Sequence, residues 1–177
     1  AHVVLMDIVK KMDERYKKLQ SIKVRNIEQY NQQMKQLLAE KKGRLTDEEK
    51  QMIVNFVQKK LAAATVSVVG LGGCGPAAAM SLAAAGVGRI GLVDYDVVDA
   101  SNLQRQVIHG TQSIGELKVE SARRRLLDLN PDIRVEIYNQ ALTSANAFEI
   151  AAPYEIIVDG TDNFPTRYLV NDLCVLT

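Results

Sequence analysis

The feature that most constrains this chain is a strand–turn–helix–strand pattern in residues 65–94. Residues 65–69 are mostly β-branched, which predicts a buried strand, and a turn rich in glycine follows them. Residues 76–85 are dominated by Ala, Met and Leu and predict a helix, after which residues 90–93 predict a second apolar strand. Strands that alternate with helices in this way are expected to lie parallel in one sheet.

The glycine-rich turn in this pattern indicates nucleotide binding. Gly70, Gly72 and Gly75 fit the spacing G-x-G-x-x-G between a strand and a helix. Glycines permit a tight turn and a close approach of backbone to phosphate, and a helix N-terminus offers free N–H groups and a partial positive charge. Pro76 suits the first position of the helix, because its missing N–H costs nothing there. Asp94 ends the second strand and is placed to accept hydrogen bonds from ribose hydroxyls.

The chain after Asp94 continues to alternate between strand and helix patterns. We predict an alternating strand over residues 134–138, a buried strand over residues 155–159, and helices that open at residues 115–118, 144 and 165. The fold class expected is therefore α/β, a doubly wound Rossmann-like parallel sheet with right-handed crossovers, preceded by a helical N-terminal segment. Ligands of such sheets bind outside the carboxyl ends of the strands, where the strand order reverses. The glycine turn, Asp94 and residues 159–163 are expected to converge on one crevice there.

The N-terminal part has a different character. Apolar residues recur at helical spacing over residues 3–39, which predicts one long amphipathic helix or two broken around Ser21. Residues 46–49 form a capping box for a further helix, whose apolar face is expected to contain Ile53, Phe56, Val57 and Leu61. We predict a helical segment over residues 1–62, serving dimerisation or partner docking, and a nucleotide-binding domain over residues 63–177.

Charge and cysteine usage narrow the class of protein. Residues 1–62 hold 14 Lys+Arg and 8 Asp+Glu, whereas residues 63–177 hold 8 and 13. The basic residues of the first part are interspersed with acids, which favours a solvated face over a nucleic-acid interface. No stretch approaches the length of a membrane span, the start lacks the pattern of a secretory signal, and the two cysteines have no C-x-x-C spacing. We expect a cytoplasmic protein that binds neither nucleic acid nor membrane.

The polar residues expected at the crevice favour phosphate chemistry. They comprise two cations, an amide and two carboxylates: Asp94, Asn102, Arg105, Lys118 and Asp162. Phosphoryl and nucleotidyl transfer need cations that neutralise developing charge and a carboxylate suited to Mg²⁺. No Ser or Cys has a nearby base, and His109, the only histidine of this half, is interpreted as a structural loop residue. No G-K-[ST] follows the glycines, so a Walker-type ATPase is not expected.

Five motifs in a fixed order resemble a known family. They are Gly70-Leu-Gly-Gly-Cys-Gly75, Asp94-Tyr-Asp96, Ser101-Asn-Leu-Gln-Arg-Gln106, Gly115-x-x-Lys118 and Asp159-Gly-Thr-Asp-Asn163. Together they resemble the ThiF/MoeB/HesA adenylyltransferases, the bacterial-type relatives of ubiquitin-activating enzymes. The resemblance covers residues 61–177 and implies that ATP adenylates the C-terminal glycine carboxylate of a small ubiquitin-like sulfur-carrier protein, with release of pyrophosphate.

The resemblance also implies a role for each matching residue. Gly72, Gly73 and Gly75 would line the nucleotide, and Asp94 would bind the ribose hydroxyls. Asn102 and Arg105 would contact the β- and γ-phosphates. Lys118 would hold phosphate charge in the transition state, and Asp162 would sit at Mg²⁺ and the α-phosphate. Because the carrier's carboxylate is itself the nucleophile, no catalytic Ser, Cys or His is needed.

Further expectations follow from the same resemblance. Members of the family work as homodimers, and the amphipathic stripe of residues 3–39 is a candidate for that contact. The family's second half, with two C-x-x-C pairs for structural Zn²⁺, would follow Thr177. Cys74 stands where the family usually has a small aliphatic residue, and we expect it to be tolerated in a buried turn. The carrier protein and its pathway, whether molybdopterin, thiamine, cysteine or tRNA thiolation, stay open.

Two other functions are compatible with parts of the sequence. The glycine motif and Asp94 alone equally allow an NAD-dependent oxidoreductase, although that class leaves Arg105, Lys118 and Asp162 without a joint role. A non-catalytic nucleotide-binding module that serves as a docking surface is the second alternative.

Overall fold

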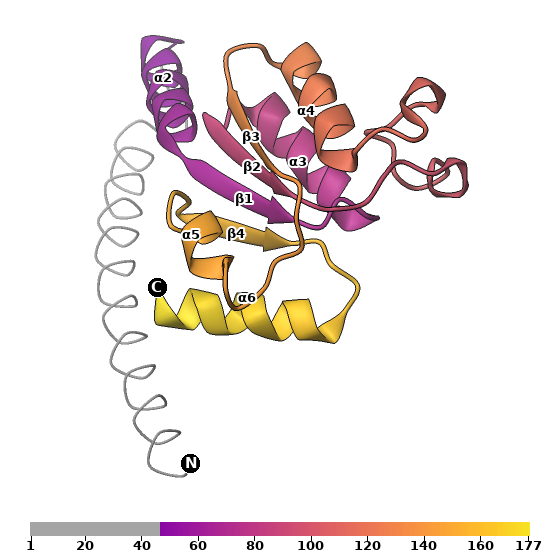
Figure 1. Cartoon of the computed structure of the whole chain (residues 1–177). Coiled ribbons are helices and arrows are strands. Elements are labelled where there is room, and N and C mark those ends of the chain that lie inside the picture. The colour runs from indigo at the N-terminus through magenta and orange to yellow at the C-terminus, as the bar shows by residue number, and fades with distance from the viewer. Residues whose placement is uncertain (1–46) are drawn as a thin grey trace, which may run out of the picture. The chain divides into compact units, whose positions relative to one another are not determined.

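A computed structural model of the chain describes residues 47–177 (Figure 1). Residues 55–177 form one compact unit, and residues 47–54, the described part of the other unit, are the start of helix α2 (Asp47–Ala63). The helix predicted to follow the capping box is therefore confirmed. The amphipathic helix predicted over residues 3–39 lies outside the described residues. The domain boundary expected after residue 62 stays a prediction. No helix in the described part is long and apolar enough to cross a membrane.

Four parallel strands form the sheet in the order β3-β2-β1-β4. Their bounds are β1 (Thr65–Val69), β2 (Arg89–Val93), β3 (Arg134–Tyr138) and β4 (Ile156–Asp159). Strands β2 and β3 lie on one side of β1 and β4 lies on the other, so the order reverses between β1 and β4. This arrangement confirms the doubly wound α/β fold expected from the alternating pattern.

Each crossover carries a helix. The helices that follow β1, β2, β3 and β4 are α3 (Cys74–Ala85), α4 (Lys118–Leu129), α5 (Ala147–Ala151) and α6 (Phe164–Leu176). Helix α3 begins two residues before the expected start, so Pro76 occupies its third position rather than its first. Two short 3₁₀ turns, η1 (Ala100–Asn102) and η2 (Thr111–Ser113), interrupt the long connection between β2 and α4.

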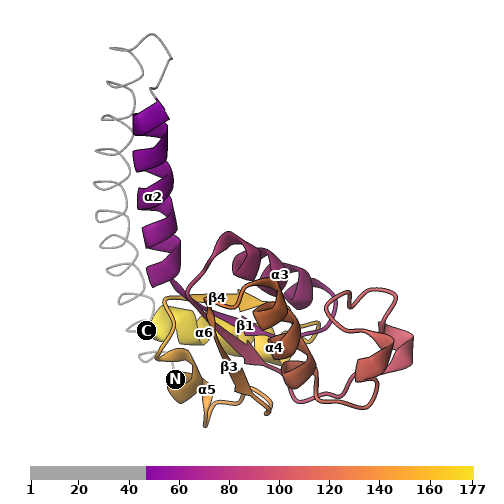
Figure 2. The ribbon, with the colours of Figure 1, turned by 90° about the horizontal axis from the view of Figure 1, so that it is seen from above.

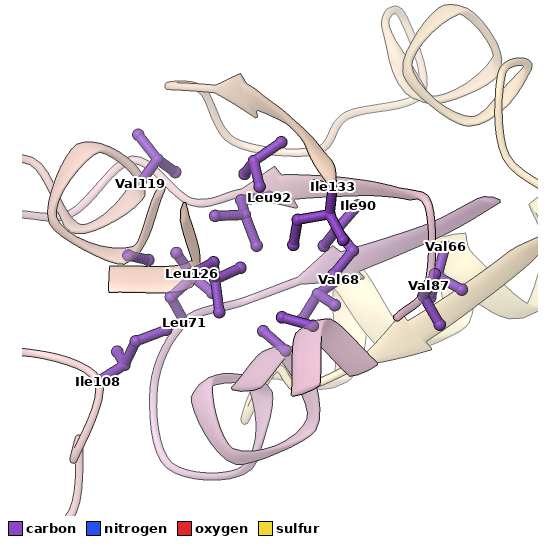
Figure 3. Packing of buried hydrophobic residues seen from close by; sticks show 14 residues of the cluster. Val66, Val68, Leu71, Val87, Ile90, Leu92, Ile108, Val119, Leu126 and Ile133 are labelled. Atoms are coloured by element: carbon purple, nitrogen blue, oxygen red, sulfur yellow. The ribbon is translucent and has the colours of Figure 1, made fainter. Parts of the chain in front are cut away.

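Alternating strand residues build a core on each face of the sheet. Val66, Val68, Ile90 and Leu92 pack against the apolar faces of α3 and α4 (Figure 3). The neighbouring residues Val69 and Val93 point to the opposite face, where they contact Ile150 of α5. Helix α6 adds Leu173 to a further cluster with α5 on that side. The period of two along the strands thus decides which helices cover which face.

The strand register sets the position of the site. Val69 pairs with Val93 and with Asp159, and Val93 pairs with Tyr138, so the four strands end at the same level. The connections after β1, β2 and β4 leave from this edge, and the β2–α4 loop (residues 94–117) projects beyond it (Figures 1 and 2). Strand β4 was expected to be buried, which is wrong: Ile156 is 53% exposed, Ile157 and Val158 are half-buried and Asp159 is exposed, because β4 is the outer strand of the described sheet.

Candidate functional site

The turn after β1 is shaped by close backbone packing. Gly70 has a φ of 87°, in the left-handed region that favours glycine, and its N–H donates to the Val93 carbonyl at 2.8 Å. A Cβ on Gly75 would lie 1.8 Å from the Gly70 oxygen, so no larger residue fits there. Around Gly72 and Gly73 no described atom outside the immediate chain lies within 4 Å of an added Cβ. The turn is therefore closed at its base and open above Gly72 and Gly73.

Asp94 is joined to this turn by a direct hydrogen bond. Its Oδ2 accepts from the Leu71 N–H at 2.6 Å, and its Oδ1 accepts from the Asp96 N–H at 2.8 Å. The carboxylate is half-buried at the end of β2. Each oxygen keeps a further lone pair for another donor. The sequence prediction that Asp94 and the glycine turn converge is thus confirmed by contact.

Lys118, the first residue of α4, reaches the same corner. Its side chain is buried, with 5% of the residue exposed, and its Nζ donates to Asp96 Oδ2 at 2.8 Å. Its backbone N–H donates to the Asp96 carbonyl at 2.9 Å. The backbone N–H of Asp96 also donates to Asp94 Oδ1. Asp96 therefore connects the Lys118 ammonium to the carboxylate that touches the glycine turn. A buried ammonium at a helix N-terminus is unfavourable without such an anionic partner.

Asp96 contacts Lys118 and Asp94 but is not among the site residues predicted from the sequence. It belongs to the D-x-D spacing after β2, and its carboxylate neutralises the buried Lys118. The spacing itself was the available signal. Nothing in one sequence, however, pairs a lysine with an aspartate 22 positions before it.

Asn102 and Arg105 lie on the β2–α4 loop. Asn102 ends η1, which Asp99 caps by accepting from the Ser101 N–H at 2.8 Å. The hydrogen bonds from the Ser101 hydroxyl and from this N–H lower the pKa of Asp99. The exposed Arg105 donates from Nη2 to Asn102 Oδ1 at 2.7 Å. Among the hydrogen bonds of residues 47–177, none joins Asn102 or Arg105 to the glycine turn. Both residues belong to the β2–α4 loop, which projects beyond the carboxyl edge of the sheet (Figure 1).

The loop after β4 packs against the glycine turn from the other side. A Cβ on Gly160 would lie 2.8 Å from the Gly70 oxygen and from Gly75 Cα, so the two turns touch through their backbones. Asp159 accepts from the N–H and hydroxyl of Thr161 and thereby shapes this loop. Asp162 is exposed. The structure thus gives Asp159 a turn-forming role and leaves the Asp162 carboxylate facing solvent.

The first residue of α3, Cys74, departs from its expected environment. It was expected in a buried turn, but its side chain is exposed because the helix already begins at this position, with Gly73 as N-cap. The thiol therefore borders the open part of the glycine turn.

Three buried polar side chains belong to the β2–α4 loop and to helix α4. Gln106, His109 and Ser121 are 1%, 7% and 2% exposed. His109 Nδ1 lies 2.9 Å from Ser121 Oγ, and burial, followed by the nearby Lys118 charge, lowers the pKa of the imidazole. The loop role expected for His109 holds, but its burial had no signal in the sequence, since a lone histidine in a polar stretch has no periodicity.

The arrangement defines a class of site. A glycine turn opens above a helix N-terminus at the point where the strand order reverses, and a carboxylate and a buried ammonium stand beside it. This is where open α/β sheets bind nucleotides. No group of three or more His, Cys, Asp or Glu side chains able to hold a metal occurs among residues 47–177. The fold and site are those of a nucleotide-binding domain of the doubly wound type.

Comparison with known families narrows this class. The profile described as the ThiF family matches residues 30–177. The chain belongs to the ThiF family, which confirms the resemblance carried by the five motifs.

Curated relatives are named for one enzyme class. Over 119 residues, 67% of this chain, it is 55% identical to the probable adenylyltransferase/sulfurtransferase MoeZ of Mycobacterium tuberculosis and to the sulfur carrier protein adenylyltransferase of Thermus thermophilus. It is 56% identical over the same length to the adenylyltransferase and sulfurtransferase MOCS3 of Bos taurus. These matches cover 30%, 44% and 26% of the relatives, so the chain spans less than half of their length.

Two solved structures of similar proteins share this fold. Escherichia coli MccB, determined with ATP, is 33% identical and superposes with a TM-score of 0.62 over 67% of this chain and 35% of MccB. The tRNA N6-threonylcarbamoyladenosine dehydratase TcdA of Escherichia coli, in complex with ATP, is 32% identical with a TM-score of 0.59 over 60% of this chain and 44% of TcdA.

Proposed function

We propose that this protein is an ATP-dependent adenylyltransferase that activates the C-terminal glycine carboxylate of a small ubiquitin-like sulfur-carrier protein and releases pyrophosphate. The observation that carries the proposal is the buried Lys118 ammonium, held through Asp96 beside the carboxylate that contacts the glycine turn. An NAD-dependent oxidoreductase leaves Arg105, Lys118 and Asp162 without a joint role, whereas nucleotidyl transfer from a triphosphate uses cations to neutralise the charge that develops on the phosphates. The names of the curated relatives support the same reaction class.

The glycine turn and Asp94 would bind the nucleotide. Gly72 and Gly73 leave open space above the N-terminus of α3, and Gly75 allows the turn to fold close to its own base. The phosphates would lie over these backbone N–H groups. Asp94 keeps free lone pairs although both its oxygens accept backbone hydrogen bonds, so it can also receive the ribose hydroxyls.

Asn102, Arg105 and Lys118 would act on the triphosphate. In the proposed step a carrier carboxylate oxygen forms a bond to the α-phosphorus, and the bond from that phosphorus to the bridging oxygen of the β-phosphate breaks. The electron pair leaves with pyrophosphate, and no proton has to move. Charge therefore builds up on the leaving phosphates, where Arg105 and Asn102 would contact them and Lys118 would neutralise them.

Asp162 would hold Mg²⁺. Its carboxylate is exposed in the loop after β4, and Mg²⁺ at phosphate-binding sites is bound through one or two carboxylates together with substrate phosphates. The residues present fit that mode, and the ion would supply neutralising charge at the phosphates.

The partners proposed are a carrier ending in Gly-Gly and a second copy of the chain. A flexible carrier tail would enter from the carboxyl edge of the sheet, from which the β2–α4 loop projects (Figure 1). The homodimer rests on the family resemblance alone.

The test is ATP–pyrophosphate exchange by the full-length protein with a Gly-Gly-ended ubiquitin-like protein. Exchange that requires the carrier, and that disappears when its last glycine is deleted, is expected. Parallel titrations with ATP–Mg²⁺ and with NADH separate the oxidoreductase alternative. Tight NADH binding without ATP affinity, or ATP binding without exchange with any such carrier, would overturn the proposal; the second result would favour a non-catalytic module.

A further inference from the structure

The β2–α4 loop is fixed at its base by backbone hydrogen bonds. Gly115 N–H donates to the Val98 carbonyl, and Val98 N–H donates to the Glu116 carbonyl, both at 2.8 Å. These bonds hold the two ends of the loop together. They do not reach its middle, where Asn102 and Arg105 lie.

A chain of hydrogen bonds runs inward from Arg105. Asn102 Oδ1 accepts from Arg105 Nη2 at 2.7 Å and from Gln106 Nε2 at 3.3 Å. Gln106 is buried, and its backbone carbonyl accepts from the His109 backbone N–H at 3.0 Å. The exposed guanidinium is thus connected, through one shared acceptor, to the buried side of the loop.

The chain ends on helix α4. His109 Nδ1 lies within hydrogen-bond distance of Ser121 Oγ, and Ser121 follows Lys118 by three residues, which places both on the same side of the helix. Ile108, next to His109, joins the core cluster that contains Leu71 of the glycine turn (Figure 3). His109 is therefore one point at which the loop is hydrogen-bonded to the helix that carries Lys118; nearer the end of the loop, Arg124 of α4 donates to Ser113 Oγ at 3.1 Å.

We propose that His109 is a positioning residue that holds Arg105 in a fixed place relative to Lys118, through Gln106 and Asn102 on one side and Ser121 on the other. This inference rests on the proposed function, because it assigns the two cations to one triphosphate. His109 does not itself touch substrate: only 7% of it is exposed, and its Nε2 has no hydrogen-bond partner among the described residues.

Burial favours a neutral His109 ring, and three charged side chains act on it. Lys118 approaches it from α4, Asp94 from the end of β2, and Glu116 from the end of the loop. Burial and the Lys118 charge outweigh the two carboxylates and lower the pKa of the imidazole. A neutral imidazole can bond to Ser121 without adding a third positive charge to the pair that it positions.

The experiment compares four variants of the full-length protein with the wild type. His109→Ala and Ser121→Ala remove the link, and His109→Asn keeps an amide near the place of Nδ1. Ser81→Ala is the matched control, because Ser81 is an exposed helix serine whose hydroxyl bonds to its own helix at Ala77. Hydrogen–deuterium exchange of residues 99–114 is measured first, since it needs no activity. ATP–pyrophosphate exchange then gives kcat and the KM for ATP.

His109→Ala and Ser121→Ala are expected to raise deuterium uptake in residues 99–114 while β1 and β2 stay protected. They should lower kcat about tenfold to a hundredfold with little change in KM, because a misplaced cation acts mainly in the transition state. His109→Asn should restore both readouts, and Ser81→Ala should change neither.

Two results would overturn the inference. The first is deuterium uptake in residues 99–114 that stays at the wild-type value in both His109→Ala and Ser121→Ala. The second is deuterium uptake that rises equally over the whole sheet, which would mean that His109 merely supports the fold. If the wild type shows no pyrophosphate exchange, the proposed function fails. Deuterium uptake still decides whether His109 ties the loop to α4.

Discussion

The glycine turn and the β2–α4 loop both leave the carboxyl edge of the sheet but are built in different ways. The turn is held by backbone: Gly70 bonds to Val93, and Gly75 and Gly160 pack directly on the Gly70 carbonyl. The loop is held in its middle by side chains, with Asn102, Gln106 and His109 making the connections. The base of the turn therefore has no room for a Cβ atom at Gly75. A side-chain substitution in the loop is expected to leave the fold intact but to shift the position of the loop residues.

This difference separates two tasks. A backbone-built turn presents its N–H groups in one geometry whether or not a ligand is bound, which suits binding. A loop held by a few side-chain hydrogen bonds can bring cations to the phosphates and adjust to them as the reaction proceeds. Changes in the turn should therefore affect folding and affinity, and changes in the loop should affect turnover.

The largest effect is expected at the base of the turn. Gly75→Ala places a Cβ where the Gly70 oxygen already lies, so we expect it to lower the free energy of unfolding by about 3 kcal/mol or more. Gly72→Ala is the matched control: it meets open space, and stability should stay within about 0.5 kcal/mol while ATP affinity falls. Urea unfolding followed by circular dichroism measures both. Equal stability of the two variants would contradict the backbone-built turn.

The next effect is on turnover. Arg105→Ala should lower the rate of pyrophosphate exchange about a hundredfold, or about 2.7 kcal/mol, the scale for removing one charge-stabilising donor. Its stability should be unchanged, because the side chain is exposed and bonds only within its own loop. Arg123→Ala, an exposed arginine on α4, is the control and should leave both quantities unaltered. Unchanged exchange in Arg105→Ala would remove Arg105 from the site.

The backbone-built region is also the one that the sequence predicted best. Glycine spacing and strand periodicity are local signals, so strand β1, the turn and the approach of Asp94 could be expected from residue types and spacing alone. The start of α3 was predicted two residues too late, and β4 was wrongly predicted to be buried. Helix starts depend on backbone angles that Gly73 can adopt in several ways, and burial of β4 depends on what lies beside it in the sheet.

The loop was less predictable because its order comes from contacts between distant residues. The motif around Asn102 and Arg105 indicated phosphate contact, yet nothing local indicated that Asp96 neutralises Lys118 or that His109 meets Ser121. Such pairs follow from how β2 and α4 meet, which is a property of the folded sheet. Single-sequence patterns carry residue types and periods, but not these distances.

A smaller effect tests the link between the two regions. Asp96→Asn removes the anionic partner of the buried Lys118, and the free energy of unfolding should fall by about 1.5 kcal/mol. Saturating ATP should reduce this difference, because a phosphate can take the place of the lost carboxylate beside the ammonium. Urea unfolding with and without ATP–Mg²⁺ gives the comparison. A loss of the same size in both conditions would mean that Lys118 does not contact bound ATP.

The smallest effect concerns pH and the middle of the loop. The pKa of His109 is lowered in the folded protein by burial and by Lys118, against the opposing charges of Asp94 and Glu116. Between this lowered pKa and about 6.5, the unfolded chain binds more protons at this residue, so stability falls as pH falls through that window.

Going from pH 7.5 to 5.5, the wild type should therefore lose up to about 1 kcal/mol more than His109→Asn, which cannot titrate. Deuterium uptake in residues 99–114, corrected for the pH dependence of intrinsic amide exchange, should rise as the pH falls in the wild type alone. The other histidine, His2, is present in both proteins and cancels in the difference. Identical pH profiles for the two proteins would show that the imidazole keeps its ordinary pKa in the folded state. The loop would then be held to α4 by something other than a neutral histidine.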